Sequence, residues 1–313
     1  MSIYTIAFYN TENLFDIYDD HLKNDDDFLP TSDKRWTKKR YERKLYKLGS
    51  VISKIGVKET NKPPSIIGLV EVENKLVLED LLQSSDLKNH NYNYVHHESN
   101  DERGIDVAML YNEDDFILDT SETFSINIVN EQGERDYTRD ILLVSGILNR
   151  EKIYCIINHW PSRREGEKES AYKRMLASKK VEEIIQNLKS TINNPKIIIM
   201  GDFNDNPNNE SIEKLVNNNN LYNPMESLQG YNIGTQNHDF QWNIFDQIFF
   251  TSNFFETSKN TLKFKEAMIF NNRFLTQYEG KFKGQPFRTY IGKKYKGGFS
   301  DHFPVYILLQ KNK

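Results

Sequence analysis

Short apolar runs, separated by polar turns, recur along the whole chain. Runs rich in β-branched and aromatic side chains that stop at Gly, Asn or Asp are typical of buried strands. They occupy residues 3–10, 65–72, 106–112, 141–148, 152–159, 196–204, 245–250, 262–270 and 303–310. The sequence NREK joins the fourth run to the fifth, which predicts a hairpin.

Two longer segments and one short segment predict helices. In residues 37–56 the apolar side chains recur three or four residues apart, as on one face of a helix, and in residues 168–190 apolar side chains can face inward while charged residues fill the other positions. These inward positions are Tyr41, Leu45, Leu48, Ile52 and Ile55 in the first segment and Ala171, Met175, Ile184, Ile185 and Leu188 in the second. Residues 75–83 predict the short helix. The basic residues from Lys34 to Lys47 are expected to form the solvated face of the first helix.

The order of these elements predicts the fold class. Helices stand between groups of strands, and at least two neighbouring strands form hairpins. This order favours two sheets packed face to face with helices outside, an α/β arrangement. We expect residues 1–313 to form a single domain, because no linker rich in Gly, Pro or Ser interrupts them.

Composition narrows the classes of function and location. The formal net charge is -4, so a polyanion would have to be attracted by a local basic patch. The single cysteine, Cys155, excludes a disulfide within the chain and a cysteine-based zinc site. The sequence shows neither a signal-peptide pattern nor an apolar run of the ~20 residues that a membrane span needs. We therefore expect a cytoplasmic protein without a membrane or an obligate protein partner.

The candidate chemistry lies where the strands stop. In the sequence IIIMGDFNDNP, residues 197–207, a buried strand reaches Gly201 and is followed by Asp202 and Asn204. Asp, Asn, Gly and Pro also form turns, so this stretch alone favours a turn. Acidic, amide and histidine side chains mark other strand ends as well: Asn10, Glu12, Glu71, Asn158, His159, Asp246, Asp301 and His302. If these ends share one edge of a sandwich, the side chains meet.

This set of side chains is typical of one kind of chemistry. Carboxylate and amide oxygens favour Mg²⁺ or Mn²⁺ held by one or two carboxylates, with water and phosphate at the other positions. Histidines act as acid, base or hydrogen-bond donor near neutral pH. Together they predict attack by water on a phosphate ester.

Eight sequence motifs resemble those of the endonuclease/exonuclease/phosphatase superfamily, in the same order. They are YNTENLFD, LVEVEN, RGIDVAMLY, TRDILLVSG, NHWPSR, GDFND, FDQIFF and GGFSDHFPV, and they run from residue 3 to residue 307. The spelling of the first and fifth is similar to a bacterial endonuclease-like branch. The resemblance implies a four-layered α/β sandwich of two mostly antiparallel sheets. It also implies metal-dependent hydrolysis of phosphodiesters or phosphomonoesters.

The resemblance assigns the metal to four residues. Glu71 is implied as the principal ligand of Mg²⁺ or Mn²⁺, helped by Asn10 and Asp301. Glu12 stands where some relatives have an aspartate near the metal.

The resemblance also assigns the catalytic roles. Asp202 would orient or deprotonate the attacking water, and Asn204 would hold that water, the scissile phosphate or a second metal. His302 would donate to a phosphate oxygen. Asp246 would hold a histidine in the right tautomer, but the resemblance does not indicate which histidine. His159 matches the histidine that some relatives use near the leaving group.

Arginines supply the candidate phosphate contacts. Arg139 of TRD resembles an arginine that contacts phosphate in the deoxyribonuclease branch. Arg163, after NHWPS, is our candidate for a second phosphate, because its planar guanidinium suits a phosphate group. The stretch 281–296 interleaves basic residues with Tyr290 and Tyr295. It is either a phosphate-binding loop over the site or a solvated loop anchored by its aromatics.

Three functions remain open from the sequence. The first is a divalent-metal-dependent nuclease acting on DNA or RNA, for which the basic stretch argues. The second is a phosphatase or phosphodiesterase of a smaller substrate, such as a nucleotide, phosphosugar or lipid headgroup, for which the overall acidity argues. The third is an inactive binding module.

Overall fold

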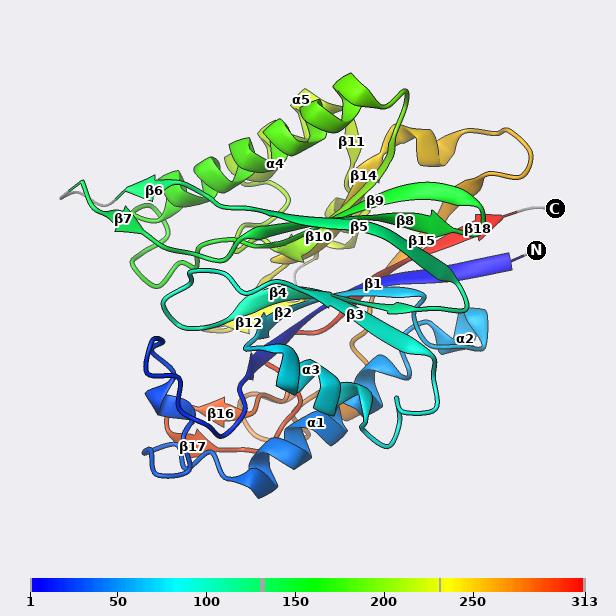
Figure 1. Ribbon diagram of the computed structural model, residues 1–313. Helices are drawn as coiled ribbons and strands as arrows, with labels where there is room; N and C mark the ends of the chain where they lie inside the picture. Colours follow the sequence, from blue (N-terminus) through cyan, green and yellow to red (C-terminus); the bar gives the residue numbers. More distant parts are fainter. Residues whose placement is uncertain (1, 130–132, 231, 312–313) are drawn as a thin grey trace.

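The structure is a computed structural model that describes residues 2–129, 133–230 and 232–311. Two six-stranded sheets lie face to face between two layers of helices (Figure 1). The first sheet has the order β15 (Leu262–Ile269), β18 (Val305–Lys311), β1 (Ser2–Leu14), β2 (Ile66–Val72), β4 (Asp106–Asn112) and β3 (Tyr92–His96). The second has the order β11 (Leu221–Tyr222), β14 (Asp246–Thr251), β10 (Lys196–Asp202), β9 (Glu151–His159), β8 (Ile141–Leu148) and β5 (Phe116–Phe124). The predicted α/β sandwich is confirmed.

Each sheet is mixed, and the parallel pairs lie at its centre. β1 pairs in parallel with β2, and β9 with β10. Their neighbours run antiparallel, including the predicted hairpin of β8 and β9. In each sheet, the carboxyl ends of the two parallel central strands therefore lie at the same edge, where the polar side chains are found.

Helices cover the outer faces of both sheets. Helices α1 (Lys38–Ile52) and α3 (Lys75–Leu82) share a buried apolar cluster with the first sheet. Helices α4 (Ala171–Thr191) and α5 (Glu210–Asn219) share another with the second sheet. A further helix, α2 (Val57–Thr60), follows the left-handed Gly56. Among the described residues, no helix has the length and apolar character that crossing a membrane requires.

The core between the sheets is closely packed. Side chains of both sheets form one buried cluster that includes Phe8, Cys155 and Ile307. Cys155 is fully buried in this cluster. In the middle of β2, a Cβ atom on Gly68 would lie 2.8 Å from the sulfur of Met200 on β10. The absence of a side chain at Gly68 thus lets the two central strands approach each other.

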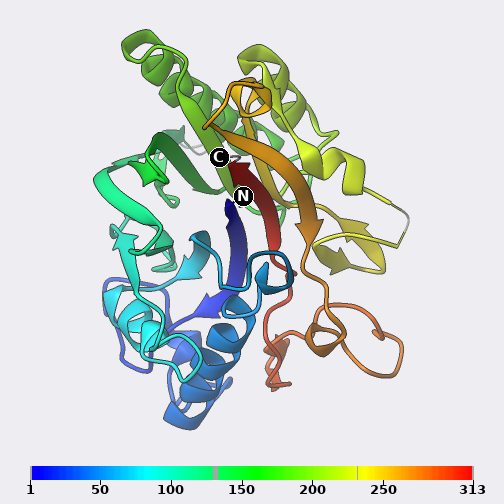
Figure 2. The same cartoon turned by 90° about the vertical axis from the view of Figure 1, so that its right-hand side faces the viewer.

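Shorter elements connect these layers. Three two-stranded hairpins are formed by β6 (Ile128–Val129) with β7 (Arg135–Asp136), β12 (Gln236–His238) with β13 (Gln241–Asn243), and β16 (Tyr290–Ile291) with β17 (Lys294–Tyr295). The 3-10 turns are Asp26–Phe28, Pro224–Leu228, Ser252–Phe255 and Arg273–Leu275. The segment between β15 and β18 descends from the sheets towards the layer that contains α1 (Figures 1 and 2).

Several elements depart from the sequence prediction. β1 continues past residue 10 to Leu14, and α1 ends at Ile52 rather than near Gly56. Ala171, expected to face inward, is exposed at the first turn of α4. The strands β3 and β5 and the helix α5 were not predicted. β3 and β5 are edge strands with mostly polar or exposed side chains, so they lack the apolar run that marks a central strand.

Candidate active site

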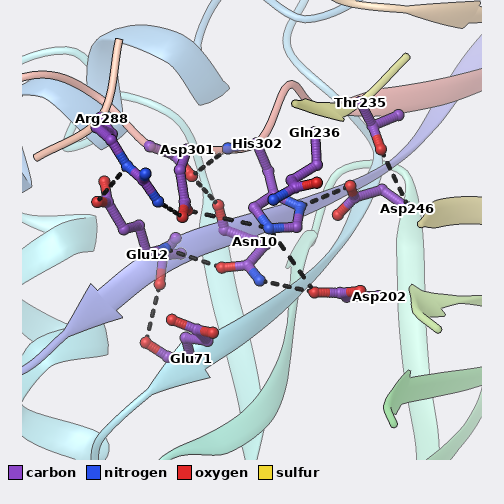
Figure 3. Close-up of polar contacts among 12 residues, drawn as sticks. Asn10, Glu12, Glu71, Asp202, Thr235, Gln236, Asp246, Arg288, Asp301 and His302 are labelled. Carbon is purple, nitrogen blue, oxygen red and sulfur yellow. Dashed lines mark hydrogen bonds and ion pairs between the residues drawn. The ribbon is translucent and has the colours of Figure 1, made fainter. Parts of the chain in front are cut away.

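Three candidate residues form a row across the second sheet. Asp202 at the end of β10 is the register partner of His159 on β9 and of Asp246 on β14. All three side chains are buried. The first sheet contributes Asn10 from β1 and Glu71 from β2, and the loop before β18 contributes Asp301 and His302 (Figure 3). The structure therefore brings together the strand-end residues that the sequence singled out.

The turn after β10 holds Asp202 from two sides. Asn10 Nδ2 donates to Asp202 Oδ2 at 3.0 Å, and the backbone N–H of Asn204 donates to Oδ1 at 3.0 Å. Asn204 adopts a φ of 50°, which turns the chain sharply there. Gly201 is required at this point because a Cβ atom would lie 2.5 Å from the carbonyl oxygen of Asn158. The stretch is thus a turn that also fixes a carboxylate.

His302 is bound to Asp246. His302 Nδ1 lies 2.7 Å from Asp246 Oδ2, which identifies the histidine that Asp246 orients (Figure 3). The backbone N–H of His302 donates to Ser300 Oγ, and that hydroxyl donates to the carbonyl oxygen of Asn10. His302 Nε2 then lies 3.9 Å from Asp202 Oδ2 and 3.9 Å from Asp301 Oδ1. The free edge of the imidazole therefore faces two carboxylates.

The surroundings set the protonation states of this cluster. Burial opposes a charged imidazole, but the charge and hydrogen bond of Asp246 and the charge of Asp202 raise the pKa of His302 well above its usual value. Burial raises the pKa of Asp202 to about 7, although nearby His302 lowers it. A charged donor and a carboxyl group that titrates near neutrality thus stand side by side, as hydrolytic sites require.

His159 differs from His302 in its charge. Burial, together with the positive charges of Arg139 and Arg103, holds the pKa of His159 well below its usual value. Arg139 Nη2 lies 3.0 Å from His159 Nε2, so this neutral ring accepts there and carries its proton on Nδ1. The same Nε2 lies 3.9 Å from Glu71 Oε1 and from Asp202 Oδ2. His159 is therefore a neutral member of the cluster.

Backbone strain concentrates at the ends of β1 and β2. Glu12, Asn13 and Glu71 have φ values of 53°, 56° and 61°, a left-handed region that such residues rarely adopt. The register between β1 and β2 shifts between Asn10 and Leu14, and that between β2 and β4 shifts around Glu71. Bulges of this kind re-aim side chains next to active sites. Here the backbone N–H of Asn13 holds Glu71 Oε2 at 2.8 Å.

A lysine that was expected to face solvent is buried behind this cluster. Lys44 on α1 is 2% exposed and donates to Thr289 Oγ1 and to the carbonyl oxygen of Phe299, both at 2.7 Å. Its Nζ lies 3.8 Å from Glu12 Oε2. The prediction of a wholly solvated basic face was wrong here. Lys44 lies three residues after Tyr41 and four before Leu48, so helical spacing places it on the inner face.

Glu12 is engaged with the loop before β18. Its Oε2 accepts the backbone N–H of Thr289 at 2.6 Å, and its Oε1 lies 3.9 Å from Arg288 Nε. Arg288 in turn donates to Asp301 Oδ2 at 2.5 Å. Burial and the nearby charge of Asp301 raise the pKa of Glu12 to about 7. Glu12 therefore ties the end of β1 to the loop, and its role as a metal ligand stays a prediction.

Two groups of residues could hold a divalent metal. Ligand atoms of Asp202, Asp246 and His302 lie within 4.8 Å of one another. His302 Nδ1 is already bound to Asp246, however, and a charged imidazole has no lone pair for a metal. The oxygens of Glu71, Asn10 and Asp301 are the hard ligands that Mg²⁺ prefers. Burial lowers the pKa of Arg288, but the charges of Asp301, Glu12 and Glu71 outweigh it and raise that pKa. This local excess of negative charge fits a cation.

The predicted phosphate-binding arginines are bound to protein groups. Arg139 is buried and also contacts Asp101 at 3.3 Å. Arg163 donates to the carbonyl oxygen of Asn204 at 2.7 Å and to Asp205 at 2.8 Å. Arg139 thus supports His159, and Arg163 supports the turn after β10. Their contacts with phosphate stay predictions.

The basic stretch 281–296 is partly anchored. Tyr290 is buried beside Trp36, with ring centroids 6.0 Å apart, and Lys293 pairs with Asp33. The side chain of Arg288 reaches the site through Asp301, and the backbone N–H of Thr289 reaches it through Glu12. Sequence reasoning missed the specific roles of Arg288 and Ser300: Ser300 is part of the SDH motif, and Arg288 was noted only as one of several basic residues before it.

The chain was compared with known proteins. A family model described as the endonuclease/exonuclease/phosphatase family matches residues 5–311. None of the curated sequences is similar enough to count as a match.

Solved structures share the fold at low sequence identity. A Bacteroides thetaiotaomicron protein of this family is 18% identical, covers 98% of both chains and has a TM-score of 0.62. A mannosyl-6-phosphatase of the same organism is also 18% identical, with 98% of this chain and 99% of that chain covered and a TM-score of 0.61. TDP2 of D. rerio with humanising mutations is 15% identical, with 99% and 100% covered and a TM-score of 0.60. The chain belongs to the endonuclease/exonuclease/phosphatase family, whose enzymes hydrolyse phosphate esters.

Proposed function

We propose that this protein is a divalent-metal-dependent phosphodiesterase, a nuclease that acts on DNA or RNA. The observation that carries the proposal is the Asp246–His302 pair, whose free imidazole edge faces Asp202 at 3.9 Å. Asp202 can therefore accept from a water molecule while the Nε2–H of His302 beside it donates to an oxygen of the phosphate. This is the arrangement that a water molecule attacking a phosphate needs.

In the proposed reaction, Asp202 is the base. It accepts a proton from water, the water oxygen bonds to phosphorus, and the ester P–O bond breaks. The leaving oxygen takes a proton from solvent. Asn10 and Asn204 hold Asp202 at its two oxygens, so the base is oriented before substrate arrives.

His302 is the charged donor in this proposal. Its Nε2–H faces the phosphate oxygens, where negative charge increases as the water attacks. Asp246 keeps the proton on Nδ1 and stabilises the charged ring. Removing one such preorganised donor from an enzyme costs about 10²–10³-fold in rate.

The metal would be held by Glu71, Asn10 and Asp301. Bound there, Mg²⁺ or Mn²⁺ would neutralise phosphate oxygens. Neutral His159 lies 3.9 Å from both Asp202 and Glu71 and is bound to Arg139 at Nε2, so in this proposal it positions these carboxylates rather than protonating the leaving group. No position needed for acid, base or metal ligation is missing, which weighs against an inactive binding module.

A smaller phosphate ester is the second candidate. The fold is shared with a mannosyl-6-phosphatase at 18% identity, so the fold itself is compatible with a small phosphate ester. The nucleic-acid candidate is favoured by the basic and aromatic residues at 281–296 beside Asp301.

A substrate panel in Mg²⁺ or Mn²⁺ separates the two. We expect hydrolysis of a single-stranded oligonucleotide or of supercoiled plasmid, abolished by EDTA and by Asp202→Asn. Asp119→Asn, an exposed carboxylate outside the site, is the matched control and should retain full activity. Hydrolysis of mannose 6-phosphate or p-nitrophenyl phosphate without cleavage of any diester would contradict the nuclease proposal.

A further inference from the structure

A hairpin leaves the active site beside His302. Gln236, the first residue of β12, forms a bridge with His302, and its side chain lies near the imidazole (Figure 3). The tip of this hairpin, two residues long, consists of Asp239 and Phe240, with φ values of 46° and 65°. Turns of this geometry normally use Asn-Gly or Asp-Gly, because glycine adopts positive φ without strain. Phe240 therefore places a large ring at a turn position whose backbone conformation favours glycine.

The ring of Phe240 is also exposed. It is 59% exposed and stacks on Phe282 of the loop after β15, with ring centroids 5.7 Å apart and planes 5° apart. Lys281 Nζ lies 4.8 Å from the centroid of Phe282. Two segments distant in sequence thus combine into a flat aromatic platform with a positive charge beside it.

This platform borders a cavity that reaches the active site. The cavity has a volume of about 260 Å³ and is lined by Asn237, Phe240, Gln277, Gln285, Arg288 and Asp301. Arg288 and Asp301 are bound to each other at the proposed reaction centre. Asn237 Oδ1 is buried and meets no hydrogen-bond donor within the described parts of the chain. An unpaired buried acceptor is costly unless a ligand satisfies it.

We propose that this cavity binds a nucleobase next to the scissile phosphate, an inference that rests on the proposed phosphodiesterase function. A flat aromatic platform suits the face of a base, and base–aromatic stacking tolerates any base sequence. Amide side chains suit the hydrogen-bonding edge of a base. The cavity is smaller than the roughly 300–1,000 Å³ of drug-sized sites, as expected for a single base. Arg288 and Asp301 lie at one end of the cavity. A base bound in the cavity would therefore place its attached phosphate towards His302.

Two substrates with the same leaving group test the site. Thymidine 5′-(p-nitrophenyl) phosphate carries a base, and methyl p-nitrophenyl phosphate carries none. We expect Phe240→Ala to raise KM for the nucleoside ester about tenfold or more, with little change in kcat or in hydrolysis of the methyl ester. Phe240→Trp keeps an aromatic ring at this position, so its KM for the nucleoside ester should stay close to that of the wild type. Tyr172→Ala, which removes an exposed ring on α4, should change neither the KM for the nucleoside ester nor the hydrolysis of the methyl ester.

Direct binding provides a readout independent of turnover. In EDTA, an oligonucleotide containing 2-aminopurine should lose fluorescence when its base stacks on the wild type. Phe240→Ala should weaken this binding about tenfold or more. Phe240→Gly should weaken it equally without lowering the melting temperature, since glycine relieves the positive φ.

The outcomes separate this inference from the proposed function. Equal KM values for wild type and Phe240→Ala on the nucleoside ester, with the methyl ester still hydrolysed, would overturn the base site alone. A higher KM for mannose 6-phosphate in Phe240→Ala, with an unchanged nucleoside KM, would assign the platform to a sugar ring and also overturn it. Hydrolysis of neither diester by the wild type would overturn the proposed function, while 2-aminopurine binding would still decide the base site.

Discussion

His302 Nδ1 lies 2.7 Å from Asp246 Oδ2, and neither side chain is more than 9% exposed. Asp246 begins β14 and His302 lies in the loop before β18, 56 positions further along the chain. In this buried pair the proton stays on the imidazole, because Asp246 raises the pKa of His302 by its charge and hydrogen bond despite the opposing effect of burial. The pair therefore sets both the orientation and the charge of the proposed phosphate donor.

Replacing Asp246 should alter both rate and pH dependence. In Asp246→Asn the imidazole loses its counter-charge, so the pKa of His302 should fall. The charged form is present below that pKa and is lost as pH rises through it. The alkaline limb of the pH–rate profile should therefore move to lower pH, and kcat/KM should fall about 10²–10³-fold. Steady-state kinetics on a phosphodiester from pH 5 to pH 10 would measure both effects.

The profile of Asp119→Asn provides the reference for that experiment, since Asp119 is far more exposed and pairs with Lys152. A rate loss in Asp246→Asn with an unmoved alkaline limb would show that Asp246 positions His302 without setting its charge.

The raised pKa of Asp202 predicts a conflict between stability and function. Burial raises that pKa from 3.8 to about 7, so the folded protein binds this proton more tightly than the unfolded chain. The resulting stability is present below pH 3.8 and is lost as pH rises through about 7. Between pH 5 and pH 8, the unfolding free energy of metal-free Asp202→Asn should rise relative to wild type by up to about 3 kcal/mol. Urea unfolding in EDTA would measure this difference; a pH-independent difference would contradict it.

Lys44 should be structural support rather than a surface charge. Lys44→Met would leave Glu12 buried without its counter-charge and the carbonyl of Phe299 without a donor. Removing one partner of a buried pair costs about 3–5 kcal/mol. The double variant Lys44→Met/Glu12→Gln should recover part of that loss. Lys39→Met, on the exposed face of α1, should change the unfolding free energy little.

Thermal unfolding with and without Mn²⁺ would locate the metal. If Glu71 is a ligand, the Mn²⁺-dependent rise in Tm should be lost in Glu71→Gln and retained in His302→Gln and in the exposed control Glu79→Gln. A ligand at 100 times its Kd stabilises by about 2.7 kcal/mol, so the loss is measurable. Loss in His302→Gln with retention in Glu71→Gln would place the ion at Asp202, Asp246 and His302 instead.

The sequence predicted the central strands and the residues at their ends well. Strands such as β10 are apolar on both faces and stop at a residue with a defined steric role, Gly201, so their bounds follow from local chemistry. Edge strand β5 was missed because most of its side chains are exposed. An edge strand with mostly exposed side chains, such as β5, carries no two-sided apolar signal.

The supports of the site were harder to predict, since they depend on contacts across the fold. The pairing of Asp246 with His302 rather than His159 depends on where the loop before β18 places His302, and local sequence does not contain that information. The positive φ of Glu71 could not be expected, because non-glycine residues rarely adopt it. Lys44 could have been found, since its helical spacing placed it between Tyr41 and Leu48.

One kinetic comparison tests the central claim most directly. Hydrolysis of methyl p-nitrophenyl phosphate in Mn²⁺ should be measured for wild type, Asp202→Asn, His302→Gln and Asp119→Asn, each shown to be folded. If Asp202 is the base and His302 the donor, the first two variants should lose at least about 10²-fold in kcat and the third should match wild type. Near-wild-type turnover by Asp202→Asn or His302→Gln would contradict the account and place the chemistry elsewhere in the molecule.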